Sequence, residues 1–251
     1  MNQTRSSRKS NPALVLLLLI HALALPAAAP AGEPAPGRYT AVPASADGIG
    51  KVYLGREIAR VMSFHGAEWL ERPERVEEER PELLLSALEL KPGMTVADIG
   101  AGTGYYSWRM AQRVGASGTV YAVDIQAEMI RLLEQQMSRR RAANVKAVLG
   151  GLTDPGLPPA SVDLALMVDV YHEFEYPYEM LAAIVRALKP GGRLVFVEFR
   201  AGDVAVPIKP LHTMTDAQVR KEAAMHALQW VKTARDLPWQ NAIVFRKSSG
   251  N

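Results

Sequence analysis

From residue 95 onward, the apolar residues of the chain alternate between two spacings. Short runs rich in Val, Ile, Leu and Ala are separated by segments in which apolar residues recur every three or four positions. The short runs predict strands at Thr95–Ile99, Thr119–Val123, Val145–Leu149, Val162–Val168 and Leu194–Phe199. The intervening segments predict helices at Tyr105–Val114, Ala127–Arg141 and Pro177–Leu188. This order indicates βαβ units and a parallel sheet with helices on both faces.

The C-terminal part of the pattern predicts one more helix and two more strands. The helix is expected over Thr215–Leu228, and the strands over Trp230–Ala234 and Ala242–Arg246. Because residues 235–241 are too few for a right-handed crossover, these two strands should be antiparallel. The predicted fold class is therefore α/β: a Rossmann-like, doubly wound, mostly parallel sheet of seven strands with an antiparallel C-terminal strand.

The first ninety residues divide into three parts before the sheet begins. Residues 32–50 are rich in Pro, Ala and Gly and show no apolar period, so we expect a flexible linker. The spacing of Leu54, Ile58 and Val61 predicts a helix over residues 51–70, and a further helix is expected at Pro81–Leu90. The charged run between them predicts a solvated helical face. We therefore assign residues 51–90 to a helical lid and 91–251 to the core domain.

The first 31 residues have the three parts of a secretory signal peptide. A basic start carrying Arg5, Arg8 and Lys9 precedes an apolar run and then an alanine-rich stretch ending at Ala31. We expect cleavage after Ala31 and a periplasmic or secreted protein, with cleavage after Ala24 as an alternative. An uncleaved N-terminal anchor, the only membrane contact that the sequence suggests, is the other alternative.

Composition and charge remove several classes of protein. With 251 residues, 48% hydrophobic and 22% charged, the chain is neither disordered nor a polytopic membrane protein. Because it has no cysteine, it has no disulfide framework, thiolate nucleophile or Cys-ligated zinc site. Beyond residue 31, the chain carries 26 basic and 26 acidic residues. This neutral balance predicts no nucleic-acid partner, and the sequence does not indicate an oligomeric state.

The stretch from Val96 to Gly104, at the junction of the first strand and first helix, contains the clearest candidate binding site. Its glycines Gly100, Gly102 and Gly104 let the backbone turn sharply and approach a ligand over the carboxyl end of the strand. Twenty residues later the second strand ends at Asp124, where a carboxylate can accept both hydroxyls of a ribose. Together these features predict a nucleoside-containing ligand.

The glycine spacing separates two classes of nucleotide-binding enzyme. Nicotinamide and flavin enzymes use G-x-G-x-x-G, whereas this chain has G-x-G-x-G with Asp98 two residues before it, so an NAD-linked oxidoreductase is disfavoured. This motif, with the stretches 121–125, 158–165 and 188–194, resembles the class I S-adenosylmethionine-dependent methyltransferases. The resemblance covers roughly residues 53–247 and is closest to the type 11 and ubiquinone/menaquinone C-methyltransferase-like branch.

The resemblance implies S-adenosylmethionine as cofactor and a role for each matching position. Asp98 would lie near the methionine end, Asp124 would bind the ribose, Ile125 would flank the adenine, and Asp169 would face the methionine moiety or the substrate. The cofactor would be lined by Gly100, Ala101, Gly102 and Gly104. In the loop after the third strand, Leu152 or Asp154 would meet the adenine.

For catalysis, we expect the protein mainly to hold an acceptor in line with the methyl group and to exclude water. If a general base takes part, His172 is the candidate, with Glu173 as the residue that orients it. A histidine that only packs against the wall is the alternative. His212 begins a segment that could close one side of the pocket. The histidine spacing suggests no metal site, so none is predicted.

The leading hypothesis is an exported methyltransferase acting on a small-molecule acceptor. S-adenosylmethionine is made in the cytoplasm, however, and an exported domain must obtain it elsewhere. This conflict raises a second hypothesis: a non-catalytic exported domain of the same fold that binds S-adenosylmethionine or another nucleoside.

Overall fold

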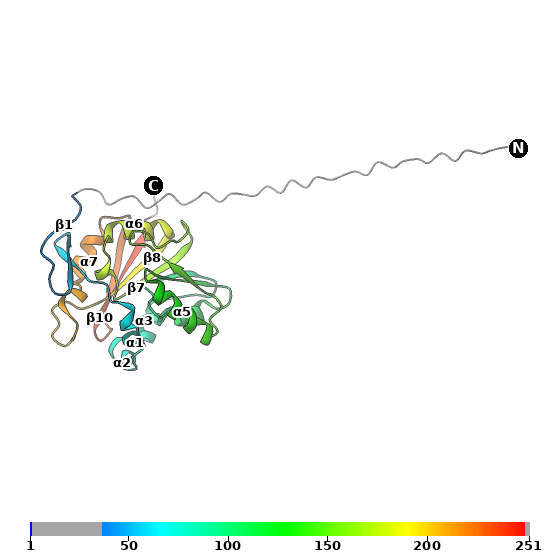
Figure 1. The fold of residues 1–251 in the computed structure, drawn as a ribbon, viewed down its shortest axis with the longest axis horizontal. Coiled ribbons are helices and arrows are strands. Elements are labelled where there is room, and N and C mark those ends of the chain that lie inside the picture. Colours follow the sequence, from blue (N-terminus) through cyan, green and yellow to red (C-terminus); the bar gives the residue numbers. More distant parts are fainter. Residues whose placement is uncertain (2–36, 249–251) are drawn as a thin grey trace.

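The computed structural model describes Met1 and residues 37–248, so the predicted signal peptide and the start of the linker lie outside the described residues. Seven strands form one sheet (Figure 1) in the order β6-β5-β4-β7-β8-β10-β9. They are β4 (Thr95–Ile99), β5 (Thr119–Asp124), β6 (Val145–Leu149), β7 (Val162–Val168), β8 (Leu188–Phe199), β9 (Leu228–Ala234) and β10 (Gln240–Lys247). β10 pairs antiparallel with both β8 and β9, and the neighbouring pairs from β6 to β8 are parallel. The predicted fold class is confirmed.

Each predicted helix of the core is present, and all four are shorter than expected. They are α4 (Ser107–Val114), α5 (Ala127–Arg139), α6 (Pro177–Ala187) and α7 (Asp216–Ala223). Thr215 caps α7, since its hydroxyl accepts a hydrogen bond from the Gln218 amide at 3.1 Å. The helices are shorter because residues predicted at their ends lie in turns or caps.

Alternate residues along the strands divide the core into two apolar layers. Ala97 and Ile99 of β4 pack in the layer that includes α6 and α7. Val96 packs in the opposite layer with α4 and with α3 (Pro81–Ala87). The strands are therefore covered on both faces, as in other parallel sheets, and their carboxyl ends meet at one edge.

The predicted helix over residues 51–70 is wrong at its start. Gly48–Tyr53 and Arg56–Ala59 form the strands β2 and β3 of a hairpin, and β1 (Thr40–Ala41) pairs with β2. Leu54 and Gly55, between β2 and β3, have φ of +47° and +93°, as a two-residue hairpin turn requires and a helix cannot accept. β1 and the start of β2 lie within residues 32–50, where the sequence predicted a flexible linker.

Short helical turns follow the hairpin and lead into the core. They are η1 (Phe64–Gly66), α1 (Ala67–Leu70) and α2 (Arg75–Glu79), and α3 comes directly after them. The segment before the hairpin is fastened to α6, because Arg38 and Tyr39 both hydrogen-bond to Glu179. Lys51 of β2 pairs with Glu175 at 2.8 Å. The N-terminal part thus lies beside the carboxyl ends of the strands.

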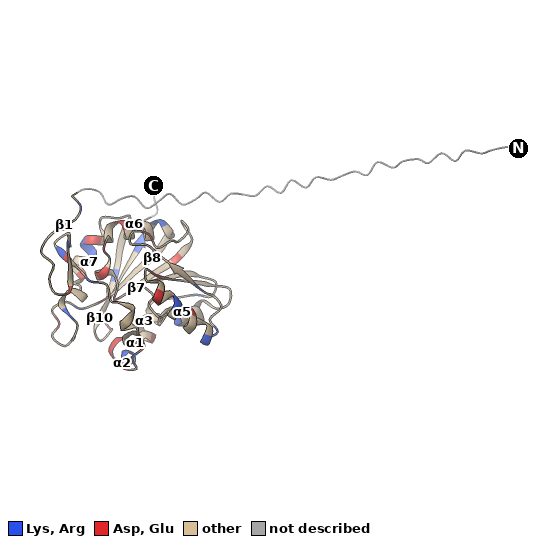
Figure 2. Cartoon of the chain, viewed as in Figure 1, with Lys and Arg blue, Asp and Glu red and all other residues tan. Residues whose placement is uncertain are grey.

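Charged residues of both signs lie next to one another on the helices (Figure 2), for example Glu128 and Arg131 on α5. None of the helices within residues 37–248 combines the length and apolar character needed to cross a lipid bilayer.

Candidate active site

Two adjoining cavities lie over the carboxyl ends of β4, β5 and β7. The larger has a volume of about 460 Å³ and the smaller about 250 Å³. Residues at the ends of these strands, including Gly100, Asp124 and Val170, line both cavities. From the N-terminal part, Arg60 and Val61 also line both. The sheet edge that the sequence indicated is therefore the floor of one continuous crevice.

The glycine turn forms part of this floor. Gly100 and Gly102 have φ of +73° and +54°, and both line the larger cavity. A Cβ at Gly100 would lie 2.3 Å from Val170 Cγ2, and one at Gly102 would lie 2.5 Å from Leu70 Cδ1. Both positions therefore need glycine for backbone conformation and for space. Ala101 and Gly104 are not among the lining residues and pack behind the turn against α5.

Asp124 connects the two cavities. Its carboxylate accepts hydrogen bonds from the amides of Gly102 at 3.0 Å and Gln126 at 2.9 Å, which hold it beside the glycine turn. Burial raises the pKa of Asp124, although these amides oppose the shift. The Gln126 side chain, which the sequence did not single out, bonds Met62 and Phe64 and so ties the N-terminal segment over Asp124.

Asp98 lies beneath the crevice and does not line it. Its carboxylate accepts a 2.6 Å hydrogen bond from the hydroxyl of Ser107, the first residue of α4. Burial raises the pKa of Asp98 to about 6, while the Ser107 hydroxyl acts in the opposite direction. The structure places this residue as a support of the turn and helix, and its expected contact with the cofactor stays a prediction.

The smaller cavity is largely apolar. Ile125 and Leu152 line it together with Phe174 and Met180, a surface suited to a flat heterocycle. Asp154 is turned away and pairs with Arg186 at 2.6 Å, so of the two candidates in this loop only Leu152 reaches the cavity.

Asp169 follows β7 and lines the larger cavity in an unusual conformation. Its φ is +50°, and residues held in this region cluster at functional sites. One carboxyl oxygen accepts a 2.6 Å bond from Gln240, and the other, Oδ1, has no hydrogen-bond partner within the described part of the chain. Burial raises the pKa of Asp169 well above its usual value. The free oxygen suits a ligand with hydrogen-bond donors.

His172 is buried in the wall of the larger cavity at 2% exposure. Its Nδ1 lies 2.6 Å from Glu198 Oε2, and Glu198 Oε1 accepts a bond from the Tyr171 amide. Burial lowers the pKa of His172, but the carboxylates of Glu198 and Glu173 raise it by more. Glu198 was missed at the sequence level, although a charged residue inside the apolar strand β8 was a signal for it.

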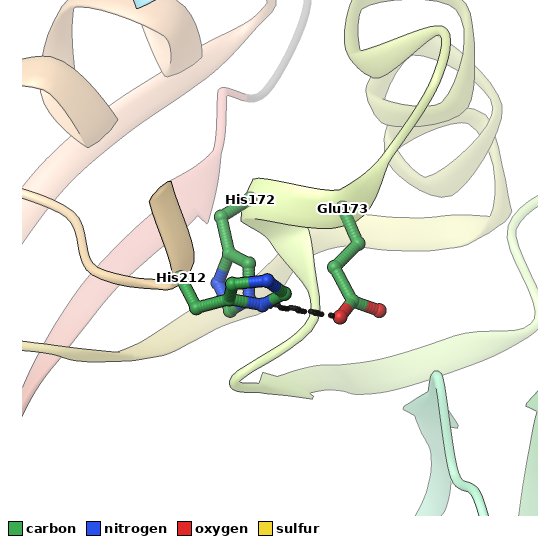
Figure 3. Close-up of side chains that lie close together, drawn as sticks. All are labelled: His172, Glu173 and His212. Carbon is green, nitrogen blue, oxygen red and sulfur yellow. Dashed lines mark hydrogen bonds and ion pairs between the residues drawn. The ribbon is translucent and has the colours of Figure 1, made fainter. Parts of the chain in front are cut away.

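Glu173 and His212 complete a cluster with His172. Figure 3 shows the two imidazole rings and the Glu173 carboxylate turned toward one another. His212 Nδ1 lies 3.2 Å from His172 Nε2 and 3.4 Å from Glu173 Oε1. Spacing along the chain did not reveal this group because His212 comes from η3 (Pro210–His212), forty positions away.

The charged run before α3, predicted to be a solvated helical face, is solvated at Glu74 and Glu77 but contains two buried residues. Arg75 and Glu79 are buried at 5% and 1% exposure, form an ion pair at 2.7 Å, and line the larger cavity. The guanidinium of Arg75 also lies 4.1 Å from the ring centre of Tyr105. The i,i+4 spacing indicated the pair correctly, but its contacts with Tyr105 and Tyr106 bury it.

The fold and the crevice together are of the kind found in class I S-adenosylmethionine-dependent methyltransferases. A glycine floor without room for Cβ atoms, a carboxylate at the end of β5 and an apolar adjoining cavity fit a nucleoside cofactor. Comparison with known families agrees: residues 90–243 match the family described as "Methyltransferase domain". The chain belongs to this family, and its cofactor is S-adenosylmethionine.

Individual relatives are distant. The chain is 32% identical over 111 residues to nocamycin O-methyltransferase of Saccharothrix syringae, a match covering 44% of this chain and 40% of that protein. It is 30% identical over 135 residues to a ubiquinone/menaquinone biosynthesis C-methyltransferase of Laribacter hongkongensis, covering 52% of each. These matches span about half or less of the relatives' lengths.

Among solved structures, a SAM-dependent methyltransferase from Aquifex aeolicus has the same fold with a TM-score of 0.71. It is 24% identical, and the match covers 74% of this chain and all of that one. These similarities support methyl transfer as the general chemistry.

Proposed function

We propose that the protein transfers the methyl group of S-adenosylmethionine to a small-molecule acceptor bound in the larger cavity. The observation that supports this most is that one cavity of about 460 Å³ is lined by Gly100, Asp124 and Asp169 and also by His172 and Glu173. Cofactor-side and acceptor-side residues thus share one space, whose volume suits a small ligand.

On the cofactor side, Asp124 is the residue proposed to hold the ribose, and Asp169 with its free Oδ1 the residue proposed to meet the methionine moiety. When bound, S-adenosylmethionine supplies a methyl group on a positively charged sulfur. Ile125 and Leu152 offer the apolar surface for the adenine. Met62 and Val170 add apolar surface to the wall of the larger cavity.

On the acceptor side, His172 is the residue proposed to engage the acceptor. With Nδ1 held by Glu198, its Nε2 is the nitrogen that faces His212 at the cavity wall, where it can accept a proton. Glu173 contacts the N-terminal segment through the Met62 amide, which donates to its Oε1 at 3.1 Å. A fixed imidazole positions an acceptor better than a mobile one.

The test is to incubate the purified full chain with S-adenosylmethionine and a small-molecule extract and to measure S-adenosylhomocysteine. We expect turnover by the wild type, and a loss of turnover in His172→Ala with unchanged cofactor affinity by calorimetry. No binding of either nucleoside by the folded protein would overturn the proposal. Binding without turnover in any acceptor fraction would favour the non-catalytic hypothesis.

We also propose that residues 1–31 export the protein. Mass spectrometry of protein recovered from the periplasm of expressing cells should show Gly32 as the first residue. A chain that starts at Met1 in the membrane fraction would favour the anchor, and a full-length cytoplasmic chain would contradict export.

A further inference from the structure

The cluster of His172, Glu173 and His212 has a feature that methyl transfer by itself does not require. Three atoms capable of ligating a metal face one another: His172 Nε2, His212 Nδ1 and Glu173 Oε1 (Figure 3). Their separations are 3.2, 3.4 and 4.0 Å. The cluster lies in the wall of the larger cavity, next to the proposed acceptor position.

These separations leave room for an ion at bonding distance. The point equidistant from the three atoms lies about 2.1 Å from each, the length of a zinc–nitrogen or zinc–carboxylate bond. We propose that His172, Glu173 and His212 bind a divalent first-row transition-metal ion. All three ligand atoms lie within 4.8 Å of one another.

The surroundings of the ligand atoms support the proposal. A metal-bound histidine commonly gives its other ring N–H to a carboxylate, and His172 Nδ1 lies 2.6 Å from Glu198 Oε2. This bond leaves the Nε2 lone pair directed to the cluster. Arg56 donates to the His172 carbonyl at 2.9 Å and so fixes the backbone of the same residue. His172 is therefore held in place before an ion arrives.

The donor types indicate which ions fit. Two imidazoles and one carboxylate favour Zn²⁺ or Fe²⁺, whereas Mg²⁺ prefers oxygen ligands in an octahedron. Three protein ligands leave at least one coordination position open, and the cluster borders the cavity, so an oxygen or nitrogen atom of the acceptor can take that position.

This last step rests on the proposed function, whereas ion binding does not. An ion and a proton compete for the same lone pair of His172. In the ion-loaded protein, therefore, the acceptor is positioned and polarised by coordination, and the proton-accepting role of His172 belongs to the ion-free protein.

The test uses the full chain after treatment with a chelator, titrated with Zn²⁺ by calorimetry. We expect His212→Ala, which removes a partly exposed ligand, to weaken binding by more than the roughly 10- to 100-fold that loss of an outer partner costs. Glu198→Gln keeps all three ligands and should weaken binding about 10- to 100-fold. His65→Ala changes an exposed histidine outside the cluster and should leave Zn²⁺ affinity unchanged.

Two outcomes would overturn the ion site. They are a folded wild type that does not bind Zn²⁺, and Zn²⁺ affinity that His212→Ala leaves unaltered. S-adenosylhomocysteine binding, measured separately, distinguishes the two proposals: a protein that binds the nucleoside but no Zn²⁺ contradicts the ion site alone. A protein that binds Zn²⁺ but no nucleoside contradicts the proposed function alone.

Discussion

Three aspartates at the carboxyl ends of neighbouring strands differ through their hydrogen-bond partners. Asp98 bonds the Ser107 hydroxyl beneath the crevice, Asp124 bonds two backbone amides at its floor, and Asp169 keeps one oxygen without a partner among residues 37–248. The residue type is the same in each case, but the neighbours decide whether the carboxyl supports the fold or faces a ligand.

At Asp124 we expect a direct effect on the cofactor. Asp124→Ala removes a carboxylate that can bond the ribose, so cofactor binding should weaken by about 1 to 3 kcal/mol, roughly 5- to 150-fold. Calorimetric titration of S-adenosylhomocysteine measures this change. Asp154→Ala is the matched control, since that carboxylate pairs with Arg186 outside the cavities. Equal affinities in the wild type and Asp124→Ala would contradict the ribose role.

At Asp98 we expect an effect of pH on stability. With its pKa raised to about 6 from the ordinary 3.8, the folded chain holds a proton that the unfolded chain releases. Asp98 therefore adds up to about 3 kcal/mol to the free energy of unfolding below about pH 4. This contribution is lost as pH rises through about 6. Asp98→Asn should flatten this part of the stability curve, measured by urea unfolding at several pH values. A curve with the wild-type slope would show that Asp98 does not titrate there.

The sequence identified residues of the site whose role depends on local motifs. Gly100 and Gly102 directly follow the first predicted strand of the core, and Asp124 follows the second. The structure places all three in the crevice. Glu198 was missed, and His212 was expected only in a segment closing one side of the pocket, because their contacts with His172 join segments 26 and 40 residues apart. Such contacts arise only from the folded arrangement of β7, β8 and η3.

Among the elements, the β2–β3 hairpin is where the sequence-based prediction was wrong. Leu54, Ile58 and Val61 have helical spacing, yet Leu54 occupies the turn and Ile58 a strand. The informative signal was Gly55, which follows Leu54 at the point where the chain reverses. A single apolar period over a dozen residues did not separate a helix from two short strands joined by a tight turn.

The hairpin turn gives a test at the level of the element. Gly55→Ala places a Cβ on a residue with φ of +93° and should lower the free energy of unfolding by about 1 kcal/mol. Gly151→Ala is the control, because its Cβ would meet only the Asp154 carbonyl oxygen at 3.7 Å and its φ is not positive. Denaturant titration compares the two. Similar stabilities for both variants would argue against the turn geometry.

At the scale of the molecule, the N-terminal hairpin is tied to the C-terminal half by a buried ion pair. Arg56 of β3 bonds Glu222 of α7 through two nitrogens, at 2.9 and 3.0 Å, and also bonds the His172 carbonyl. Tyr171 donates its hydroxyl to the same carboxylate. The segment before the core therefore supports the site through α7.

Arg56→Met should reveal this dependence. The change leaves the Glu222 carboxylate buried without its cation, so the free energy of unfolding should fall by about 3 to 5 kcal/mol in chemical denaturation. The double variant Arg56→Met/Glu222→Leu should recover much of the loss. Arg220→Met breaks a more exposed pair with Asp216 and should cost less than about 1 kcal/mol. If Arg56→Met hardly lowers the free energy of unfolding, the buried Glu222 carboxylate does not depend on Arg56 for its neutralisation.

The architecture of the whole sheet was predictable because each βαβ unit carries its own alternation of periods. Four strand ranges from β4 to β7 were predicted to within one residue, and the antiparallel arrangement of β9 and β10 followed from their short connection. The packing of residues 38–59 against α6 and α7 was not predictable, because it depends on long-range ion pairs.

The insertion of β10 between β8 and β9 has a consequence for the order of folding. On the ribosome, β8 is made before β10, so the edge of β8 that β10 will cover stays unpaired until residues 240–247 have emerged. An unpaired apolar edge is a template for pairing with another chain. Nascent chains halted before residue 240 should therefore be bound by chaperones or aggregate, while chains that include β10 close the sheet.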